Sequence, residues 1–315
     1  MPERRRRIAP PPFRIAIVGG GVVGSTLGRL FADAGAEITA VVSRTAASAR
    51  RAGTFVGCRT VGTSVAVIPQ RTTLIYITAP HAAIPGVAEE IGEADGLVHR
   101  SLAVCHASGV LTAAALAPAA RAGATVFSFH PLQTFPRSFR PEALLDLARG
   151  IPFGVDGSAG GVRHARRLAS LLGGTVILVP PEARPLYHAA CVVASNHLTT
   201  LLSVLEQMYR AAGIRRPSAT EAFGPIMRAT MLNAARTSPA ASLSGPIARG
   251  GVSTVSAHLD ALGRAVPELL PYFAAVSRET VRLARRRGSI TKEQANALLD
   301  VLAAPAAAAQ STEDQ

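Results

Sequence analysis

The 315-residue chain predicts an α/β fold in which a doubly wound, mostly parallel sheet precedes an all-helical C-terminal domain. Two observations support this. From Phe13 to about Pro180, short apolar runs alternate with helical segments, which is typical of a parallel sheet with helices on both faces. After Pro181 the strand signals stop, and apolar residues recur at helical spacing instead. We therefore expect one domain over residues 13–181 and a helical domain over residues 182–303.

Seven short runs rich in apolar and β-branched residues are predicted to be strands. They are Arg14–Val18, Glu37–Val42, Leu74–Thr78, Leu102–His106, Thr125–Ser128, Pro152–Val155 and Thr175–Val179. The helices predicted for the C-terminal domain are Ala183–Ala212, Thr220–Thr237, Thr254–Leu262, Pro267–Arg287 and Thr291–Leu302. The last one opens on Thr291-Lys-Glu-Gln294, which is similar to a capping box. We expect a disordered basic arm over residues 1–12 and a disordered Ala-rich tail over residues 304–315.

A glycine-rich turn follows the first predicted strand. Gly19, Gly21 and Gly24 have the G-x-G-x-x-G spacing, and Val22 and Val23 belong to the apolar helix that follows. In such a turn the first glycine permits the bend, the second lets the backbone approach a pyrophosphate, and the third permits close helix packing. The helix N-terminus directs unpaired N–H groups at the phosphates. This pattern predicts a Rossmann-type dinucleotide site; the alternative is an ordinary strand–turn–helix corner.

The end of the second predicted strand indicates which dinucleotide binds. An NAD site usually has Asp or Glu about 20 residues after the glycines, where it holds the ribose 2′-hydroxyl. This chain has Ser43-Arg44-Thr45 instead. A guanidinium between two hydroxyls would bind a 2′-phosphate through charge-assisted hydrogen bonds, whereas an acid would repel it. We therefore predict NADP(H) as the cofactor; the alternative is that Arg44 is one more solvated arginine.

Polar residues follow the later strands, whose carboxyl ends face the ligand in this type of sheet. Thr78-Ala79-Pro80 is expected to line the dinucleotide. The Ser108 hydroxyl is expected near the nicotinamide or the substrate, unless it only stabilises a turn. His130 precedes a proline, which holds it extended, and Gln133 follows in the same apolar segment. We expect both to bind a ligand; the alternative for His130 is a satisfied core histidine.

The long helix predicted over residues 183–212 carries polar residues within an apolar sequence. His188, Val192 and Asn196 have i, i+4, i+8 spacing and are expected to share a face that lines a cleft. The candidates for substrate binding in the rest of the domain are Asn233, Ser244 and Arg249. The guanidinium would bind an anionic substrate, and its alternative is a solvated loop position. The helical domain also has more apolar surface than a small bundle needs, which predicts a homodimer.

Composition argues against other classes of protein. The net charge is +13, but the arginines are largely dispersed and aromatic residues are only 4%, so base stacking on nucleic acid is not expected. No apolar run approaches the roughly 20 residues that span a bilayer, and the N-terminus lacks a signal peptide's apolar region. The cysteines have neither metal nor disulfide spacing, which is typical of a reducing compartment. We therefore expect a cytoplasmic protein without a metal, membrane or nucleic-acid partner.

Five motifs occur in the order His106-x-Ser-Gly109, His130-Pro-Leu-Gln-Thr-Phe135, Tyr187-His-Ala-Ala190, Ser195-Asn-His197 and Ser244-Gly-Pro-Ile-Ala-Arg-Gly250. Together they resemble the Rossmann-like, DUF2520 domain-containing oxidoreductases. The resemblance extends from about Phe13 to Arg287 and implies an NADP-dependent dehydrogenase. It implies a relation in architecture to pyrroline-5-carboxylate reductases, β-hydroxyacid dehydrogenases and ketopantoate reductases, with ketopantoate as the leading substrate. The family usually has Thr-Gly-Pro and Arg-Gly-Asp in the last motif. This chain has Ser244 in place of the threonine and Gly251 in place of the aspartate, so the acid is lost.

The chemistry that this resemblance implies is constrained by a missing lysine. Many β-hydroxyacid dehydrogenases and ketopantoate reductases use a lysine on the first helix of the second domain as proton donor. The only lysine here is Lys292, and Val192 stands where the donor would lie. Histidine is then the best donor near neutral pH. We expect hydride transfer to a carbonyl or imine carbon, with proton transfer by His130 or His188, hydrogen bonds to the oxygen from Ser108 and Asn196, and carboxylate binding by Arg249.

Other functions are compatible with the same residues. One is an imine or amino-acid-type reductase, which a substrate screen would separate from a ketoacid reductase. Another is a non-catalytic NADP(H)-binding protein, because the fold alone does not prove catalysis.

Overall fold

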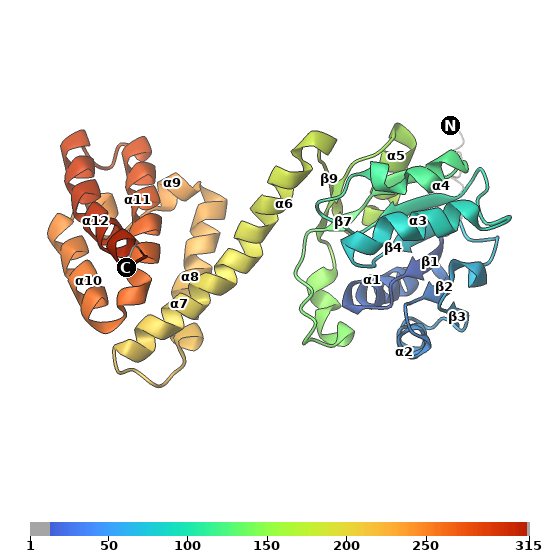
Figure 1. Ribbon diagram of the computed structural model, residues 1–315, viewed down its shortest axis with the longest axis horizontal. Coiled ribbons are helices and arrows are strands. Elements are labelled where there is room, and N and C mark those ends of the chain that lie inside the picture. Colours follow the sequence, from blue (N-terminus) through green and yellow to red (C-terminus); the bar gives the residue numbers. More distant parts are fainter. Residues whose placement is uncertain (1–12, 314–315) are drawn as a thin grey trace, which may run out of the picture. The chain divides into compact units, whose positions relative to one another are not determined.

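The computed structural model describes the backbone of residues 13–313 and divides the chain into two compact units (Figure 1). The first unit ends at Ser195 and the second begins at Asn196. The arm predicted over residues 1–12 lies outside the described residues. The boundary between the units lies within the first helix predicted for the C-terminal domain, so this helix begins in the first unit. The side chain of Arg184, at its start, is fully buried there.

The first unit contains a six-stranded parallel sheet with the order β3-β2-β1-β4-β5-β6. Its strands are β1 (Arg14–Val18), β2 (Glu37–Val42), β3 (Val61–Gly62), β4 (Leu74–Ile77), β5 (Ala103–His106) and β6 (Thr125–Ser128). The strand order reverses between β1 and β4, and ligands of such sheets bind outside the carboxyl ends of the strands at that point. The predicted doubly wound, Rossmann-type fold is confirmed. The sequence did not predict β3, which is only two residues long.

Helices cover both faces of this sheet. They are α1 (Val22–Asp33), α2 (Ala46–Val56), α3 (Ile84–Glu93), α4 (Ala117–Arg121) and α5 (Ala159–Leu171). Side chains alternate along β1, so that Ile15 and Ile17 pack with α1 and α5, whereas Ala16 and Val18 pack with α3 and α4. The carboxyl ends of β1, β4, β5 and β6 are therefore held between two apolar layers.

The last two predicted strands form a separate small sheet. Here β8 (Pro152–Val155) pairs in parallel with β9 (Thr175–Leu178) and antiparallel with β7 (His130–Pro131). The ring of Phe129, just before β7, stacks on Phe153 of β8 with centroids 4.0 Å apart. This sheet places β7, and with it His130, directly after the end of β6.

The second unit is helical, as predicted. Its helices are α7 (Leu198–Ala211), α8 (Ala219–Arg236), α9 (Pro239–Ser242), α10 (Val252–Ala265), α11 (Leu270–Arg287) and α12 (Lys292–Glu313). Val255, Val281 and Leu298 belong to the core shared by α10, α11 and α12. The predicted capping box is confirmed, because Thr291 N–H donates to Gln294 Oε1 and Gln294 N–H donates to Thr291 Oγ1.

Two predictions for the helices need correction. The predicted continuous helix over residues 183–212 consists of α6 (Arg184–Val192), a π-helical turn (Val193–His197) and α7. The i, i+4, i+8 spacing places His188 and Asn196 on one face only in a continuous α-helix, and this turn interrupts it. The tail predicted to be disordered from residue 304 is helical, since α12 continues to Glu313. Alanine, which dominates this tail, has the highest helix propensity.

One helical run of the described chain, Pro181–Ala211, is long and apolar enough to cross a membrane by length and composition. Only 6% of its most apolar window is buried. The sequence predicted no such segment, because no uninterrupted apolar run approaches the roughly 20 residues that span a bilayer. Length and composition are weak evidence for a membrane span, since helices of soluble proteins meet the same criteria.

Candidate functional site

The glycine turn has the geometry that its spacing predicts. Gly19 has a φ of +121°, and an added Cβ atom would lie 2.6 Å from the carbonyl carbon of Thr78. A Cβ atom on Gly24 would clash with the carbonyl oxygen of Gly19. The Thr78 hydroxyl, just after β4, donates a hydrogen bond of 2.7 Å to the same oxygen. The first and third glycines are therefore required for the turn and for the close approach of α1 to β1.

The second glycine leaves open space at the helix N-terminus. Gly21 is the N-cap of α1, no side chain caps this end, and a Cβ atom on Gly21 would meet nothing within 4 Å. The first N–H groups of α1, which starts at the half-buried Val22 and Val23, therefore face an open position with a positive helix dipole. Such an N-terminus binds anions, and its geometry fits the pyrophosphate of a nicotinamide dinucleotide.

The segments after β4 and β2 lie beside this turn. The half-buried Ala79 follows Thr78, and Pro80 is exposed. A Cβ atom on Gly20 would lie 3.4 Å from the Cβ atom of Ser43. The Thr45 hydroxyl accepts a hydrogen bond of 3.2 Å from Ser48 N–H and thereby caps α2. Arg44, between the two hydroxyl residues, is exposed.

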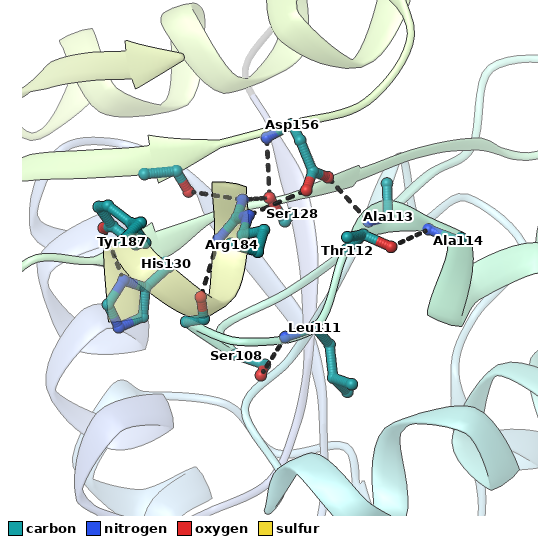
Figure 2. Close-up of polar contacts among 12 residues, drawn as sticks. Ser108, Leu111, Thr112, Ala113, Ala114, Ser128, His130, Asp156, Arg184 and Tyr187 are labelled. Atoms are coloured by element: carbon teal, nitrogen blue, oxygen red, sulfur yellow. Dashed lines mark hydrogen bonds and ion pairs between the residues drawn. The ribbon is translucent and has the colours of Figure 1, made fainter. Parts of the chain in front are cut away.

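A second polar site surrounds a buried arginine at the ends of β6 and β8 (Figure 2). The Arg184 side chain is 0% exposed, and its Nε donates a hydrogen bond of 2.9 Å to Asp156 Oδ2. The other guanidinium nitrogens donate to Ser128 Oγ and, at 3.4 Å each, to the carbonyl oxygens of Gly109 and Gly154. We call Arg184, Asp156 and Ser128 the arginine cluster. Its charges are paired, as burial of ions requires.

Further hydrogen bonds join the arginine cluster to the loop after β5. Asp156 Oδ1 accepts a hydrogen bond of 2.7 Å from Ala113 N–H, and Asp156 N–H donates one of 2.8 Å to Ser128 Oγ. Because Arg184 begins α6, one buried side chain positions segments from β5, β6, β8 and α6 relative to one another. These contacts explain why α6 belongs to the first unit.

The loop after β5 is also held from within. The buried His106 accepts a hydrogen bond of 3.2 Å from Ser108 N–H through Nδ1, and its Nε2 lies 3.0 Å from the carbonyl oxygen of Thr112. Burial lowers the pKa of His106, which favours the neutral ring that these two bonds require. The Ser108 hydroxyl accepts a hydrogen bond of 3.1 Å from Leu111 N–H. Ser108 therefore stabilises a turn, while its hydroxyl hydrogen can still be donated.

Two histidines and a tyrosine meet beside the arginine cluster. His130 Nδ1 lies 2.9 Å from the Tyr187 hydroxyl, and the ring centroids of His130 and His188 are 6.4 Å apart. A Cβ atom on Gly109 would lie 2.9 Å from His130 Nε2 and 2.7 Å from His188 Cδ2. A Cβ atom on Gly154 would clash with the Tyr187 hydroxyl. These two glycines leave the space that the three rings occupy.

The charge state of His130 follows from its surroundings. Burial, followed by the positive charge of Arg184 and the nearby His188 and His106, lowers the pKa of His130 to about 4. His130 is therefore neutral at physiological pH and can donate a hydrogen bond from only one ring nitrogen. A neutral ring favours a role for His130 as a hydrogen-bonding partner of a ligand over a role as a protonated general acid.

The other predicted site residues have different surroundings. The side-chain amide of Gln133 is hydrogen-bonded within its own loop. Its Nε2 donates a hydrogen bond of 2.6 Å to the carbonyl oxygen of Leu147, and its Oε1 accepts hydrogen bonds from Thr134. Asn196 is exposed in the π-helical turn and belongs to the second unit. The remaining predicted substrate residues are exposed in that unit: Asn233, Ser244 and Arg249. The structure thus brings His130 and His188 together within the first unit, beside Gly109, the residue that follows Ser108.

Sequence reasoning missed the residues that organise this site. Arg184 and Asp156 were assigned no role, and Tyr187 was only part of a motif. Asp156 follows the predicted strand Pro152–Val155, so its place at a strand end was a usable signal. Nothing in the sequence distinguishes Arg184 from the other arginines, because its burial depends on partners 28 or more residues away.

Family models match both parts of the chain. Residues 1–131 match the Rossmann-like domain, and residues 151–280 match the domain of unknown function DUF2520. The chain is a Rossmann-like and DUF2520 domain-containing protein. No curated protein matches it in sequence.

Solved structures of low sequence identity share the fold. A candidate NADP oxidoreductase from Bacteroides fragilis is 20% identical with a TM-score of 0.66, and the match covers 86% of this chain and 98% of that one. A pyrroline-5-carboxylate reductase from Coxiella burnetii is 14% identical with a TM-score of 0.56, over 72% and 81%. A reductive aminase from Aspergillus terreus, solved with NADPH, is 17% identical with a TM-score of 0.52, over 93% of each chain. At these identities the likeness establishes the fold.

Proposed function

We propose that this protein is an NADP(H)-dependent oxidoreductase that transfers a hydride between NADPH and a small carbonyl substrate that carries a carboxylate. The observation that carries this proposal is the open N-terminus of α1, where Gly21 leaves room for a pyrophosphate between the glycine turn and the helix dipole. The names of the structural neighbours, an NADP oxidoreductase candidate and an NADPH-bound reductive aminase, support the same class of reaction.

The preference for NADP(H) is supported by local charge. The segment from Ser43 to Arg59 contains four arginines and no acidic residue. Arg44 is exposed beside the N-terminus of α2, where a ribose 2′-phosphate would meet both a guanidinium and a helix dipole. The hydroxyls of Ser43 and Thr45 would add hydrogen bonds.

NADPH supplies the hydride when it is bound, and the protein has to bind the substrate and handle a proton. His130 or His188 would interact with the substrate oxygen as negative charge develops, and Ser108 would donate its remaining hydroxyl hydrogen. Gly109 keeps the space beside both histidines free of a side chain. Asn196 and Arg249 of the second unit, with Gln133, Asn233 and Ser244, stay candidates for substrate binding. Ketopantoate is our first substrate to test.

The first experiment measures dissociation constants of NADPH and NADH by fluorescence titration. We expect the wild-type protein to bind NADPH tightly and NADH weakly. Arg44→Ala should weaken NADPH binding about tenfold or more, which is about 1.4 kcal/mol, and leave NADH unchanged. Arg121→Ala is the matched control, because this exposed arginine ends α4 just before the amino end of β6. Binding of neither dinucleotide would exclude the proposal.

Substrate screening separates the two catalytic alternatives. NADPH oxidation with ketopantoate alone would support a ketoacid reductase, and oxidation that requires an added amine would support an imine reductase. The name of the Aspergillus terreus neighbour, a reductive aminase, favours including the second reaction. Tight NADPH binding without turnover of any carbonyl or imine would instead indicate a non-catalytic NADP(H)-binding protein.

We also propose that the protein is a cytoplasmic homodimer, formed through its helical unit. Ala219 is the only buried residue of the 18-residue α8, whereas Ile226, Met231 and Leu232 are each more than half exposed. Exposed apolar side chains in such a group favour association with a second copy. Light scattering should give the mass of a dimer, and Leu232→Glu should shift it toward a monomer. A monomeric wild-type protein would refute this part.

A further inference from the structure

The hydrogen bond between Tyr187 and His130 has a definite direction. A neutral imidazole has one N–H donor and one acceptor nitrogen, and a phenol donates through its O–H. The imidazole nitrogen is the stronger base of the two acceptors, so the favoured bond runs from the Tyr187 O–H to His130 Nδ1, over 2.9 Å. The ring proton of His130 then resides on Nε2. Figure 2 shows the Tyr187 hydroxyl pointing at the imidazole ring.

Three features hold the Tyr187 phenol in this position. The guanidinium of Arg184 lies 5.6 Å from the centre of the phenol ring, which permits a cation–π contact. Arg184 itself is fixed by its ion pair with Asp156. The absence of a side chain on Gly154 leaves room for the hydroxyl. Burial raises the pKa of Tyr187, so the hydroxyl keeps its proton and remains a donor.

The Nε2 side of the His130 ring faces Gly109, which has no side chain to cover this nitrogen. A Cβ atom on Gly109 would lie 2.9 Å from Nε2, so any side chain at this position would block the approach of a ligand atom to this nitrogen. The Nε2–H group is therefore the donor that His130 can offer to a ligand.

We propose that Tyr187 is a positioning residue that fixes His130 as the neutral tautomer with its proton on Nε2, so that this N–H donates to the substrate oxygen beside Gly109. The part of this inference that concerns substrate rests on the proposed function, whereas the tautomer is a property of the protein alone. His130 then stabilises the developing negative charge as a neutral hydrogen-bond donor.

Nitrogen-15 NMR of histidine-labelled protein at pH 7 tests the tautomer without any substrate. We expect His130, assigned by comparison with His130→Asn, to show a protonated Nε2 and an unprotonated Nδ1. Tyr187→Phe should remove this preference and give a mixture of tautomers. Tyr209→Phe, which removes a hydroxyl from α7, should leave the His130 signals unchanged. A wild-type spectrum with the proton on Nδ1 would overturn the inference, whatever the variants do.

Kinetics test the second half of the proposal. If NADPH-dependent turnover is found, Tyr187→Phe should lower kcat about tenfold while the dissociation constant of NADPH stays within about twofold. Wild-type kcat in Tyr187→Phe would overturn the role in catalysis. Failure of the wild-type protein to bind NADPH would refute the proposed function and leave the NMR result on the tautomer standing.

Discussion

The glycine turn and the arginine cluster both lie at carboxyl ends of strands in the first unit, but they are built in opposite ways. The glycine turn is made of backbone, and its essential positions Gly19, Gly21 and Gly24 lie within six residues of the sequence. The arginine cluster is made of buried side chains, and Arg184 reaches partners 28 and 75 residues away. The first site is open to an anion, whereas the second satisfies its own charges internally.

This difference separates a binding function from a positioning function. At the glycine turn no side chain caps the first N–H groups of α1, so they can donate to a bound anion. In the arginine cluster every charge has a partner, so the cluster fixes neighbouring groups, the His130 and Tyr187 rings among them, and binds nothing itself. The first site should therefore respond to substitutions through ligand affinity, and the second through stability and geometry.

The largest expected effect is the loss of one partner of the buried ion pair. Asp156→Ala would leave the Arg184 guanidinium buried without its counter-charge, which typically costs about 3–5 kcal/mol. Urea unfolding measures this as a lower midpoint. The double variant Asp156→Leu with Arg184→Met removes both charges and should recover much of the lost stability. If Asp156→Ala lowered the free energy of unfolding by less than about 1 kcal/mol, the ion pair between Asp156 and Arg184 would not be important for stability.

The sequence predicted the glycine turn correctly because the physics of that site is local. A strand, three glycines at fixed spacing and an apolar helix determine its geometry within about a dozen residues. The same reasoning predicted His130 and Ser108 at strand ends, but it did not find Arg184, Asp156 or the role of Tyr187. Their roles depend on which of many arginines the fold buries and on the empty space at Gly154. Those properties arise only when β8 and α6 pack together.

Acid should destabilise the side-chain site more than the glycine turn. The pKa of folded His130 is about 4, against about 6.5 in an unfolded chain. The unfolded state therefore binds more protons between these pH values. The contribution of His130 to stability is fully present above about pH 6.5 and is lost as the pH falls toward 4. The maximal contribution of His130 to stability is about 3 kcal/mol, because each pH unit between the two pKa values corresponds to about 1.4 kcal/mol. Thermal melts at several pH values should show a smaller loss in His130→Gln, whereas the exposed His81→Gln should match wild type.

Alanine at two glycines of the turn should separate folding from binding. Gly24→Ala places a methyl group against the carbonyl oxygen of Gly19, and such overpacking typically costs about 1–3 kcal/mol. That exceeds the gain in helix propensity, which is about 1 kcal/mol. The methyl group of Gly21→Ala would meet nothing within 4 Å, so stability should change little. The same methyl group would occupy the space proposed for the pyrophosphate, so NADPH affinity should fall at least about tenfold. Unchanged affinity in Gly21→Ala would mean that no phosphate approaches this backbone.

The smallest expected effect concerns the exposed charges of α1, the helix that the glycine turn opens. Asp33 accepts a hydrogen bond of 2.8 Å from Arg29 at i, i+4 spacing, with both side chains partly exposed. Exposed pairs of this kind contribute about 0.3–0.5 kcal/mol, because water screens the charges and both side chains lose freedom. Asp33→Ala should therefore lower stability by less than about 1 kcal/mol and leave NADPH affinity unchanged. A loss comparable to that of Asp156→Ala would show that side-chain charges hold the glycine turn as well. The contrast between a backbone site and a side-chain site would then fail.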